Sequence, residues 1–178
     1  FTNLEASALC CNFKNLASGE FLLPGYAVRN IGDIKIGFIG VTNPKTISRQ
    51  LMKYFSDDNG TLLYSFCEEN LCELVQQNVD KARSEGADYI VVLSHLGEKP
   101  NGSVTSLDLI AATNGIDVVL NAHAHSIIPD QRPTNKDGKE VILSSTGLKF
   151  ANIGLLTISK EGQLSVELVP TQDLEPID

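Results

Sequence analysis

Two stretches of sequence decide the fold of this chain. Residues 88–95 read Asp-Tyr-Ile-Val-Val-Leu-Ser-His, and residues 115–125 read Gly-Ile-Asp-Val-Val-Leu-Asn-Ala-His-Ala-His. Each contains a short apolar run, rich in β-branched residues, that is followed by a polar end with histidine. Continuous apolar runs of this length are typical of strands buried on both faces of a parallel sheet. We therefore predict two buried strands, 88–93 and 116–120, whose carboxyl ends carry the histidines.

Helical patterns accompany these strands. Residues 68–85 place apolar side chains near a 3.6-residue repeat, and Gly86 follows where a helix would stop. A second helix is expected over 107–113, before Gly115. The order strand, helix, strand, helix, strand predicts an α/β fold with a mixed sheet.

Shorter patterns lie on both sides of this centre. On the amino-terminal side we expect strands at 6–13, 20–23, 26–31 and 34–41, with a turn at 30–33, and a short helix at 44–52. On the carboxyl-terminal side the segments 141–145, 151–159 and 163–169 alternate in polarity and are separated by glycine-containing turns. These three segments predict an antiparallel meander.

The composition limits the kinds of protein this can be. The chain has 178 residues, of which 42% are hydrophobic and 20% are charged, and this suits one globular domain or a large part of one. No apolar run approaches the roughly 18 residues of a membrane span. A net charge of −8 disfavours nucleic acid as a partner. It leaves a small phosphorylated substrate open, because a bound cation reverses the local charge.

The four cysteines give no recognised motif. Cys10 and Cys11 are adjacent, and Cys67 and Cys72 are five residues apart, so neither pair has the spacing of a zinc knuckle or a redox site. Cys10 and Cys11 would face opposite ways on a strand. Four buried thiols are expected, and a long-range disulfide stays open.

The histidines carry the chemistry. The chain has three, His95, His123 and His125, and all follow directly on the predicted buried strands. Ligands of open α/β sheets bind at the carboxyl ends of the strands, and neutral imidazole is a common ligand of zinc, manganese and iron. We predict a metal site built from these three residues, with Asn121 beside it as a supporting group. Three imidazoles and a water would also complete a mononuclear zinc site.

The two stretches resemble motifs of a known family. Residues 88–97 resemble the fourth motif of the calcineurin-like metallophosphoesterases, in the branch of the 5′-nucleotidases, and 115–126 resemble the fifth, which is usually Gly-His-x-His. The separation of about 28 residues between the motifs is also similar. The resemblance covers essentially the whole chain and includes the segments 8–15, 34–42, 63–71 and 144–155. One departure is Ala122, where the family has glycine.

The resemblance implies a fold and a metal site. It implies one half of a four-layer α-β-β-α sandwich with mixed sheets, and it makes residues 1–178 a fragment of the catalytic domain without the family's first three motifs. It also implies two divalent metal ions of the zinc, manganese, iron or magnesium class. His95 and His123 would bind one ion and His125 the other. The remaining family ligands do not occur here, so we expect weak metal binding and little activity from this chain alone.

The resemblance also implies an activity. The longer protein would hydrolyse nucleoside 5′-phosphates, its partner being a nucleotide or another phosphate ester, outside the cytoplasm, in the periplasm or on the cell surface. Hydrolysis of 2′,3′-cyclic nucleotides or other esters of the superfamily stays open, as does a non-enzymatic binding domain with a degenerate metal site. The missing strands would leave apolar surface on this chain, which predicts self-association or a covering partner.

Overall fold

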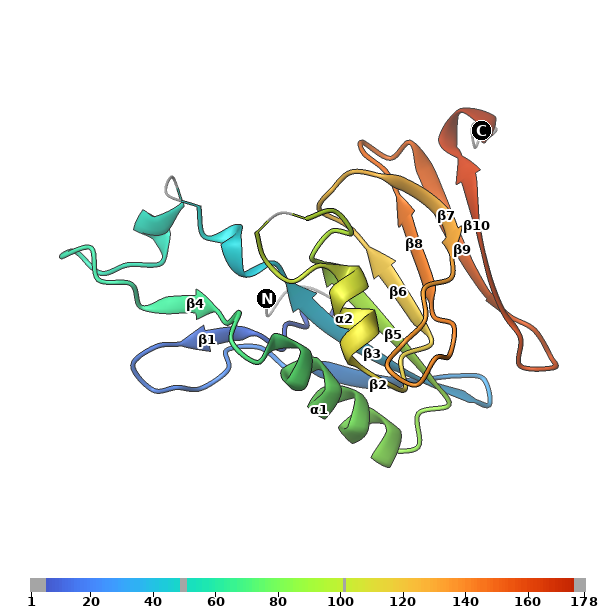
Figure 1. Ribbon diagram of the computed structural model, residues 1–178, viewed down its shortest axis with the longest axis horizontal. Helices are drawn as coiled ribbons and strands as arrows, with labels where there is room; N and C mark the ends of the chain where they lie inside the picture. The colour runs from blue at the N-terminus through green and yellow to red at the C-terminus, as the bar shows by residue number, and fades with distance from the viewer. Residues whose placement is uncertain (1–5, 49–50, 101, 175–178) are drawn as a thin grey trace.

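The centre of the molecule is a six-stranded mixed sheet (Figure 1). The computed structural model describes residues 6–48, 51–100 and 102–174. The strand order is β2 (Tyr26–Ile31), β3 (Ile34–Thr42), β5 (Tyr89–His95), β6 (Val118–Asn121), β8 (Ile142–Thr146) and β7 (Ile127–Gln131). Strands β3, β5, β6 and β8 are parallel, and β2 and β7 are antiparallel edges. The predicted mixed α/β sheet is confirmed.

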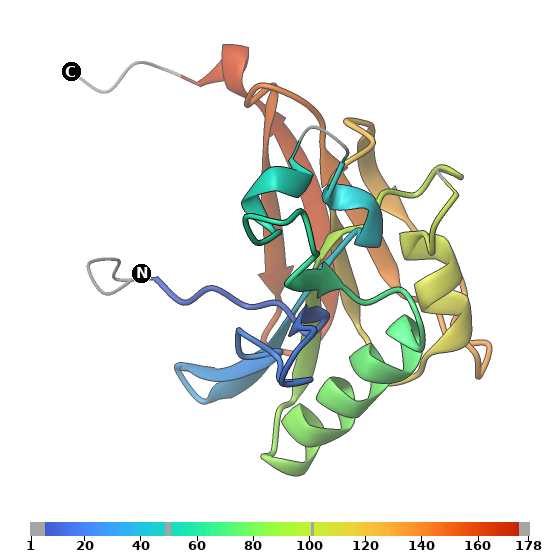
Figure 2. The ribbon, with the colours of Figure 1, turned by 90° about the vertical axis from the view of Figure 1, so that its left-hand side faces the viewer.

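Two helices cover one face of this sheet (Figure 2). Helix α1 (Leu71–Ser84) buries Leu71, Val75, Val79 and Ala82 at helical spacing against the sheet. Helix α2 (Ser106–Ala112) begins with a capping box, in which the Thr105 side chain and the carboxylate of Asp108 each accept a backbone N–H. The largest apolar core lies between these helices and the sheet.

A hairpin covers part of the other face. Strands β9 (Asn152–Ile158) and β10 (Leu164–Pro170) form a separate two-stranded antiparallel sheet. Their apolar side chains pack against a second, smaller core that includes Val91 and Val118 of the central sheet. The chain thus places helices, a sheet and a second sheet in successive layers (Figure 2), as expected for part of an α-β-β-α sandwich.

The predicted carboxyl-terminal meander is wrong. β9 and β10 form the expected hairpin, but β8 lies in the central sheet, parallel to β6 and antiparallel to β7. Strand β7 was not predicted, because Pro129 and its polar or charged positions obscure its pattern. Alternating polarity shows that a strand has one covered face, but it does not identify the neighbouring strand.

The predicted strand over 6–13 is also wrong. Ordered pairing begins only at β1 (Phe13–Asn15), which pairs with β4 (Tyr64–Phe66). The predicted strand over 20–23 is reduced to a single bridge at Phe21. The expected helix over 44–52 is two 3-10 turns, η1 (Pro44–Thr46) and η2 (Met52–Tyr54), with residues 49–50 outside the described part. A further 3-10 turn, η3 (Thr171–Asp173), follows β10.

The cysteines differ from the expectation in one respect. All four are free thiols; Cys10 and Cys11 are buried, whereas Cys67 and Cys72 are half-buried. Cys10 and Cys11 are both buried because the segment before β1 passes between other chain segments: their N–H groups donate to Pro24 and Gly40. Burial, with the neighbouring Cys10, raises the pKa of Cys11 to about 12, so this thiol is unreactive at neutral pH.

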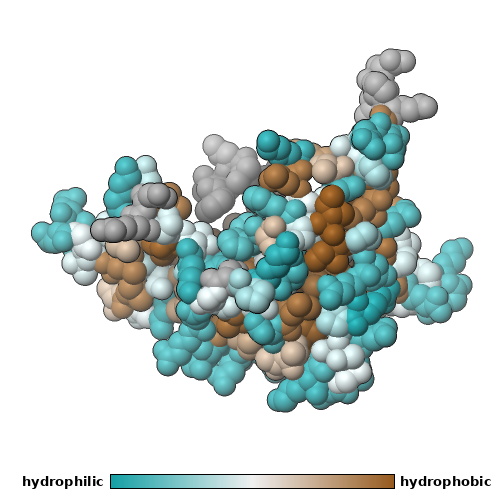
Figure 3. All heavy atoms as spheres, turned by 45° about the horizontal axis from the view of Figure 1, so that its top comes forward, coloured by the Kyte–Doolittle hydropathy of each residue, from teal (hydrophilic) through white to brown (hydrophobic). Residues whose placement is uncertain are grey.

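Apolar side chains remain exposed on the sheets. Leu93 of the central strand β5 is 41% exposed, and Ile153 and Leu155 of β9 are about half exposed. Figure 3 shows hydrophobic residues reaching the surface between hydrophilic areas. Among the described residues, no helix is long and apolar enough to cross a membrane.

Candidate metal site

The three histidines follow two neighbouring strands at one edge of the central sheet. β5 ends at His95, and β6 ends at Asn121, two residues before His123. The strands are parallel neighbours in which Ser94 pairs with Asn121, and the Ala122 N–H donates to the Ser94 carbonyl oxygen at 2.9 Å. The register therefore brings the residues after both strands together at the carboxyl edge.

The rings of His95 and His123 are in contact. Their centroids are 5.1 Å apart, and their planes are inclined by 72°. Two imidazoles on one tetrahedral zinc have ring centroids about 5 Å apart, given Zn–N bonds of roughly 2.0–2.1 Å. The spacing of this pair would allow both rings to bind one ion.

His123 and His125 adopt an uncommon backbone conformation. Their φ angles are +91° and +56°, in the left-handed region, which costs a residue other than glycine roughly 1–2 kcal/mol. The segment between β6 and β7 is thus a tight turn, and not a continuation of the strand. Strain of this kind gathers at functional sites, where surrounding contacts hold it in place.

The electrostatics favour a neutral imidazole at His95. Partial burial, and then the nearby His123 and His125, lower the pKa of His95 below its ordinary value. His125 therefore lies within electrostatic reach of His95. A neutral imidazole has the free nitrogen lone pair that a metal requires.

The described residues fit part of a metal site. Within residues 6–48, 51–100 and 102–174, no three histidine, cysteine, aspartate or glutamate side chains converge on one point. The rings of His95 and His123 are in contact, and His125 is near enough to lower the pKa of His95, so these three imidazoles are the groups here that could hold a metal.

A buried chain of hydrogen bonds supports this edge. The Ser94 and Ser106 hydroxyls are 2.8 Å apart, and Ser106 donates to the Asn121 Oδ1 at 2.7 Å. The Asn121 Nδ2 donates to the Glu98 Oε2 at 2.9 Å, and the Ser126 hydroxyl donates to the Glu98 Oε1 at 2.5 Å. Asn121 therefore lies at the base of the turn that carries two of the histidines, and its amide contacts Ser106 and Glu98.

Sequence reasoning did not select Glu98. A carboxylate three residues after His95, in the loop that follows a buried strand, was a signal that could have found it. Burial raises the pKa of Glu98, but hydrogen bonds from Ser126, its own backbone and Asn121 outweigh burial, so the pKa lies below its ordinary value. Glu98 is therefore ionised at neutral pH.

Gly97 allows the loop after β5 to approach the site. Its φ is +76°, and a Cβ at this position would lie 3.3 Å from the Cδ2 of His123. Its carbonyl oxygen accepts the Ser106 N–H at 2.7 Å. Glycine thus lets one short loop contact both His123 and the start of α2.

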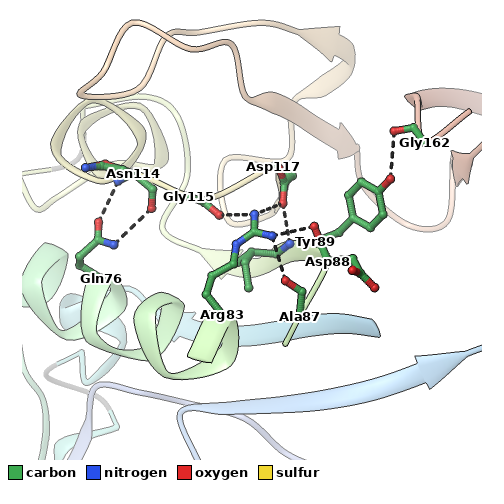
Figure 4. A network of polar contacts seen from close by, with 10 residues as sticks. Gln76, Arg83, Ala87, Asp88, Tyr89, Asn114, Gly115, Asp117 and Gly162 are labelled. Carbon is green, nitrogen blue, oxygen red and sulfur yellow. Dashed lines mark hydrogen bonds and ion pairs between the residues drawn. The ribbon is translucent and has the colours of Figure 1, made fainter. Parts of the chain in front are cut away.

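The opposite ends of the same strands carry a different polar cluster (Figure 4). Arg83 of α1 donates to the carbonyl oxygens of Ala87, Asp88 and Gly115, and forms an ion pair of 2.7 Å with Asp117. From the sequence alone, Asp88 and Asp117, which precede the strands, would be taken for solvated caps. Asp88 is exposed, but Asp117 is partly buried and structural.

Comparison with known proteins finds bacterial proteins that are similar to parts of this chain. No protein-family model matches the chain. The endonuclease YhcR of Bacillus subtilis is 27% identical over 124 residues, which are 67% of this chain and 10% of YhcR. The trifunctional nucleotide phosphoesterase YfkN of the same species is 29% identical over 101 residues, 54% of this chain and 6% of YfkN. A 2′,3′-cyclic-nucleotide 2′-phosphodiesterase/3′-nucleotidase of Salmonella typhimurium is 27% identical over 112 residues, 61% of this chain and 16% of the enzyme.

Solved structures give the same fold. The sulfate thiohydrolase SoxB of Thermus thermophilus superposes with a TM-score of 0.71 and 24% identity, over 96% of this chain and 30% of SoxB. A 5′-nucleotidase precursor from Thermus thermophilus superposes with a TM-score of 0.67 and 23% identity, over 93% of this chain and 34% of the precursor. The relatives and structural neighbours thus include proteins named as a nucleotide phosphoesterase, a 5′-nucleotidase precursor and a calcineurin-like phosphoesterase, and this chain has part of the fold of the solved structures. It spans 6–16% of the length of these three curated relatives.

Proposed function

We propose that residues 1–178 are one part of the catalytic domain of a longer two-metal phosphoesterase, to which they supply His95, His123 and His125. The observation that carries this proposal is the contact of the His95 and His123 rings at the ends of adjacent parallel strands, with centroids 5.1 Å apart. In this proposal His95 and His123 hold one divalent ion, and His125 takes part in holding a second.

The chain's own residues would do three things. The lowered pKa of His95 keeps its imidazole neutral and ready to bind at neutral pH. The turn after β6 presents His123 and His125 from one side, and Asn121 fixes the base of that turn through Ser106 and Glu98. When bound, divalent ions of this kind stabilise negative charge on a phosphate ester and lower the pKa of water.

The substrate we propose is a nucleoside 5′-phosphate. The support is the resemblance of residues 88–97 and 115–126 to the motifs of the 5′-nucleotidases, together with relatives whose names include nucleotide phosphoesterase and nucleotidase. Other phosphate esters are the alternatives to test, because one relative is named a 2′,3′-cyclic-nucleotide phosphodiesterase and another an endonuclease. By the same resemblance, we place the protein outside the cytoplasm or on the cell surface, and we expect the apolar surface around Leu93 to be covered by other parts of the protein or by self-association.

The test uses the full-length protein that carries this chain. We would measure bound metal by elemental analysis, and turnover of AMP, 2′,3′-cyclic AMP and DNA, in the wild type, His95→Ala and His123→Ala. Each variant should lose about 1000-fold in turnover together with bound metal, because an open ligand position removes an ion from the site. Lys160→Ala, in the exposed turn between β9 and β10, is the control. Full metal content and turnover in both histidine variants would overturn the proposal.

A further inference from the structure

We propose that Glu98 is a positioning residue that holds the turn of residues 121–126 in the conformation presenting His123 and His125. The metal-binding role of His123 and His125 rests on the proposed function. That Glu98 fixes the turn rests on the geometry alone, and the two parts are tested separately below.

The carboxylate of Glu98 binds the turn at both ends. Its Oε2 accepts from Asn121, the last residue of β6, and its Oε1 accepts from Ser126, just before β7. The two donors are five residues apart, and the two histidines with positive φ lie between them. The Glu98 side chain thus links the two ends of the segment whose backbone is strained.

The direction of the hydrogen bonds requires an acceptor at this position. Ser106 donates its one hydroxyl proton to the Asn121 Oδ1, so Ser94 donates to Ser106. The Asn121 oxygen is then occupied, and its NH₂ group points to Glu98. With Ser126 also donating, both oxygens of Glu98 receive protons from their partners. An ionised carboxylate can only accept hydrogen bonds, so it suits this position. An amide side chain here would place its NH₂ donor against one of the two groups that already donate, the Asn121 amide or the Ser126 hydroxyl.

Burial makes the arrangement strong. The side chain of Glu98 is only 10% exposed, and Ser94, Ser106 and Asn121 are buried. Charge-assisted hydrogen bonds are worth more than neutral ones, and more again where water is excluded. Contacts of this strength offset the strain of the two left-handed residues.

The rival explanation is that Glu98 is itself a metal ligand. Both of its oxygens are engaged by side chains of the turn, which favours positioning over ligation. The two roles separate experimentally, because Ser126→Ala removes one hydrogen bond of the turn and leaves the Glu98 carboxylate in place.

The first experiment needs no metal. Amide hydrogen exchange would be followed by mass spectrometry in the metal-free full-length protein, in peptides that cover residues 121–127. Glu98→Gln should speed exchange there by about tenfold, since local opening becomes easier once the turn is released. The Ala122 N–H, which donates to Ser94, reports this opening. Glu161→Gln, in the exposed turn after β9, is the matched control. Exchange equal to the control would overturn the proposal whether or not the protein binds metal.

The second experiment tests the consequence. Affinity for Zn²⁺ would be measured by competition with a chromophoric chelator in the wild type, Glu98→Gln and Ser126→Ala, with Ser165→Ala on β10 as a control. A positioning role predicts a loss of about 10–100-fold in both Glu98→Gln and Ser126→Ala. A loss in Glu98→Gln alone would identify Glu98 as a ligand and overturn the proposal. If the wild type binds no Zn²⁺, the proposed function fails, and the exchange result still decides the role of Glu98 in the turn.

Discussion

The two ends of the strand pair β5 and β6 use polar side chains in different ways. At the amino ends, Arg83 joins α1 to both strands through three backbone carbonyls and the carboxylate of Asp117 (Figure 4). Asp117 also accepts the Ile90 N–H at 2.7 Å, which ties β6 to β5. In this cluster the positive charge of Arg83 is paired with the negative charge of Asp117.

At the carboxyl ends the polar groups serve another purpose. Three imidazoles lie near one another, and two of them sit on strained backbone. The buried hydrogen bonds lead to Glu98, which holds the turn. The amino ends stabilise the fold, whereas two residues after the carboxyl ends lie on strained backbone, a loss of stability that the proposed function explains by the need to present metal ligands. Substitutions at the two ends should therefore separate stability from metal binding.

The largest effect on stability should come from the amino ends. Arg83→Leu should lower the free energy of unfolding by about 1–3 kcal/mol, because three carbonyls and Asp117 lose their donor, with a discount for partial exposure. Metal binding should stay at the wild-type level. The measurement is urea unfolding of the metal-free full-length protein, followed by zinc titration. Arg132→Leu is the matched control, since Arg132 forms an ion pair with Asp130 at the same distance of 2.7 Å, but both residues lie at the end of the single strand β7. Equal losses in both variants would contradict the comparison.

A smaller effect is expected at Gly97. Gly97→Ala should cost about 1 kcal/mol of stability, because alanine is unfavourable at the φ of +76°. It should also weaken zinc binding several-fold, since the new methyl group would press on His123 at 3.3 Å. Gly138→Ala is the control: its φ of +77° is nearly the same, and its Cβ meets nothing within 4 Å. Both variants should lose stability alike, and only Gly97→Ala should lose zinc affinity. Unchanged zinc affinity in Gly97→Ala would remove this loop from the site.

The smallest effect concerns pH, and it has opposite signs at the two ends. The pKa of Asp117 is raised above 3.8, by burial first and against the opposing contacts of Ile90 and Arg83. Folding therefore disfavours the ionised form of the Asp117 carboxyl. The free energy of unfolding that this group contributes rises as pH falls through its folded pKa, because the carboxyl then becomes protonated. The pKa of Glu98 lies below 4.5, so its contribution is complete above pH 4.5 and is lost as pH falls through the folded pKa.

The two variants that remove these charges report the difference. The stability of the wild type relative to Glu98→Gln should shrink as pH falls from about 6 to about 3, while its stability relative to Asp117→Asn should grow. Urea unfolding at each pH measures both differences. Parallel trends for the two variants would show that the two ends do not differ in their electrostatics.

Local patterns predicted the centre of the molecule well. The two apolar runs became β5 and β6 because their length and β-branched residues suit a strand buried on both faces. Helix α1 was predicted from its repeat, although it starts at Leu71, after Asn70 in a left-handed conformation, and not at residue 68. The region before β1 was wrongly predicted as a strand, because its backbone hydrogen bonds go to Pro24 and Gly40, which are distant in sequence.

By itself, the sequence determined which residues could carry the chemistry and the edge at which they would meet. Three histidines after two buried strands lie at one edge if the strands are parallel neighbours, since parallel strands share their carboxyl ends, and the structure confirms that pairing. Only the tertiary structure decided how close the rings come, that His123 and His125 sit on left-handed backbone, and that Glu98 closes their turn. The register of β5 and β6 and the hydrogen bonds across their loops set these features, and they join residues that no local pattern relates.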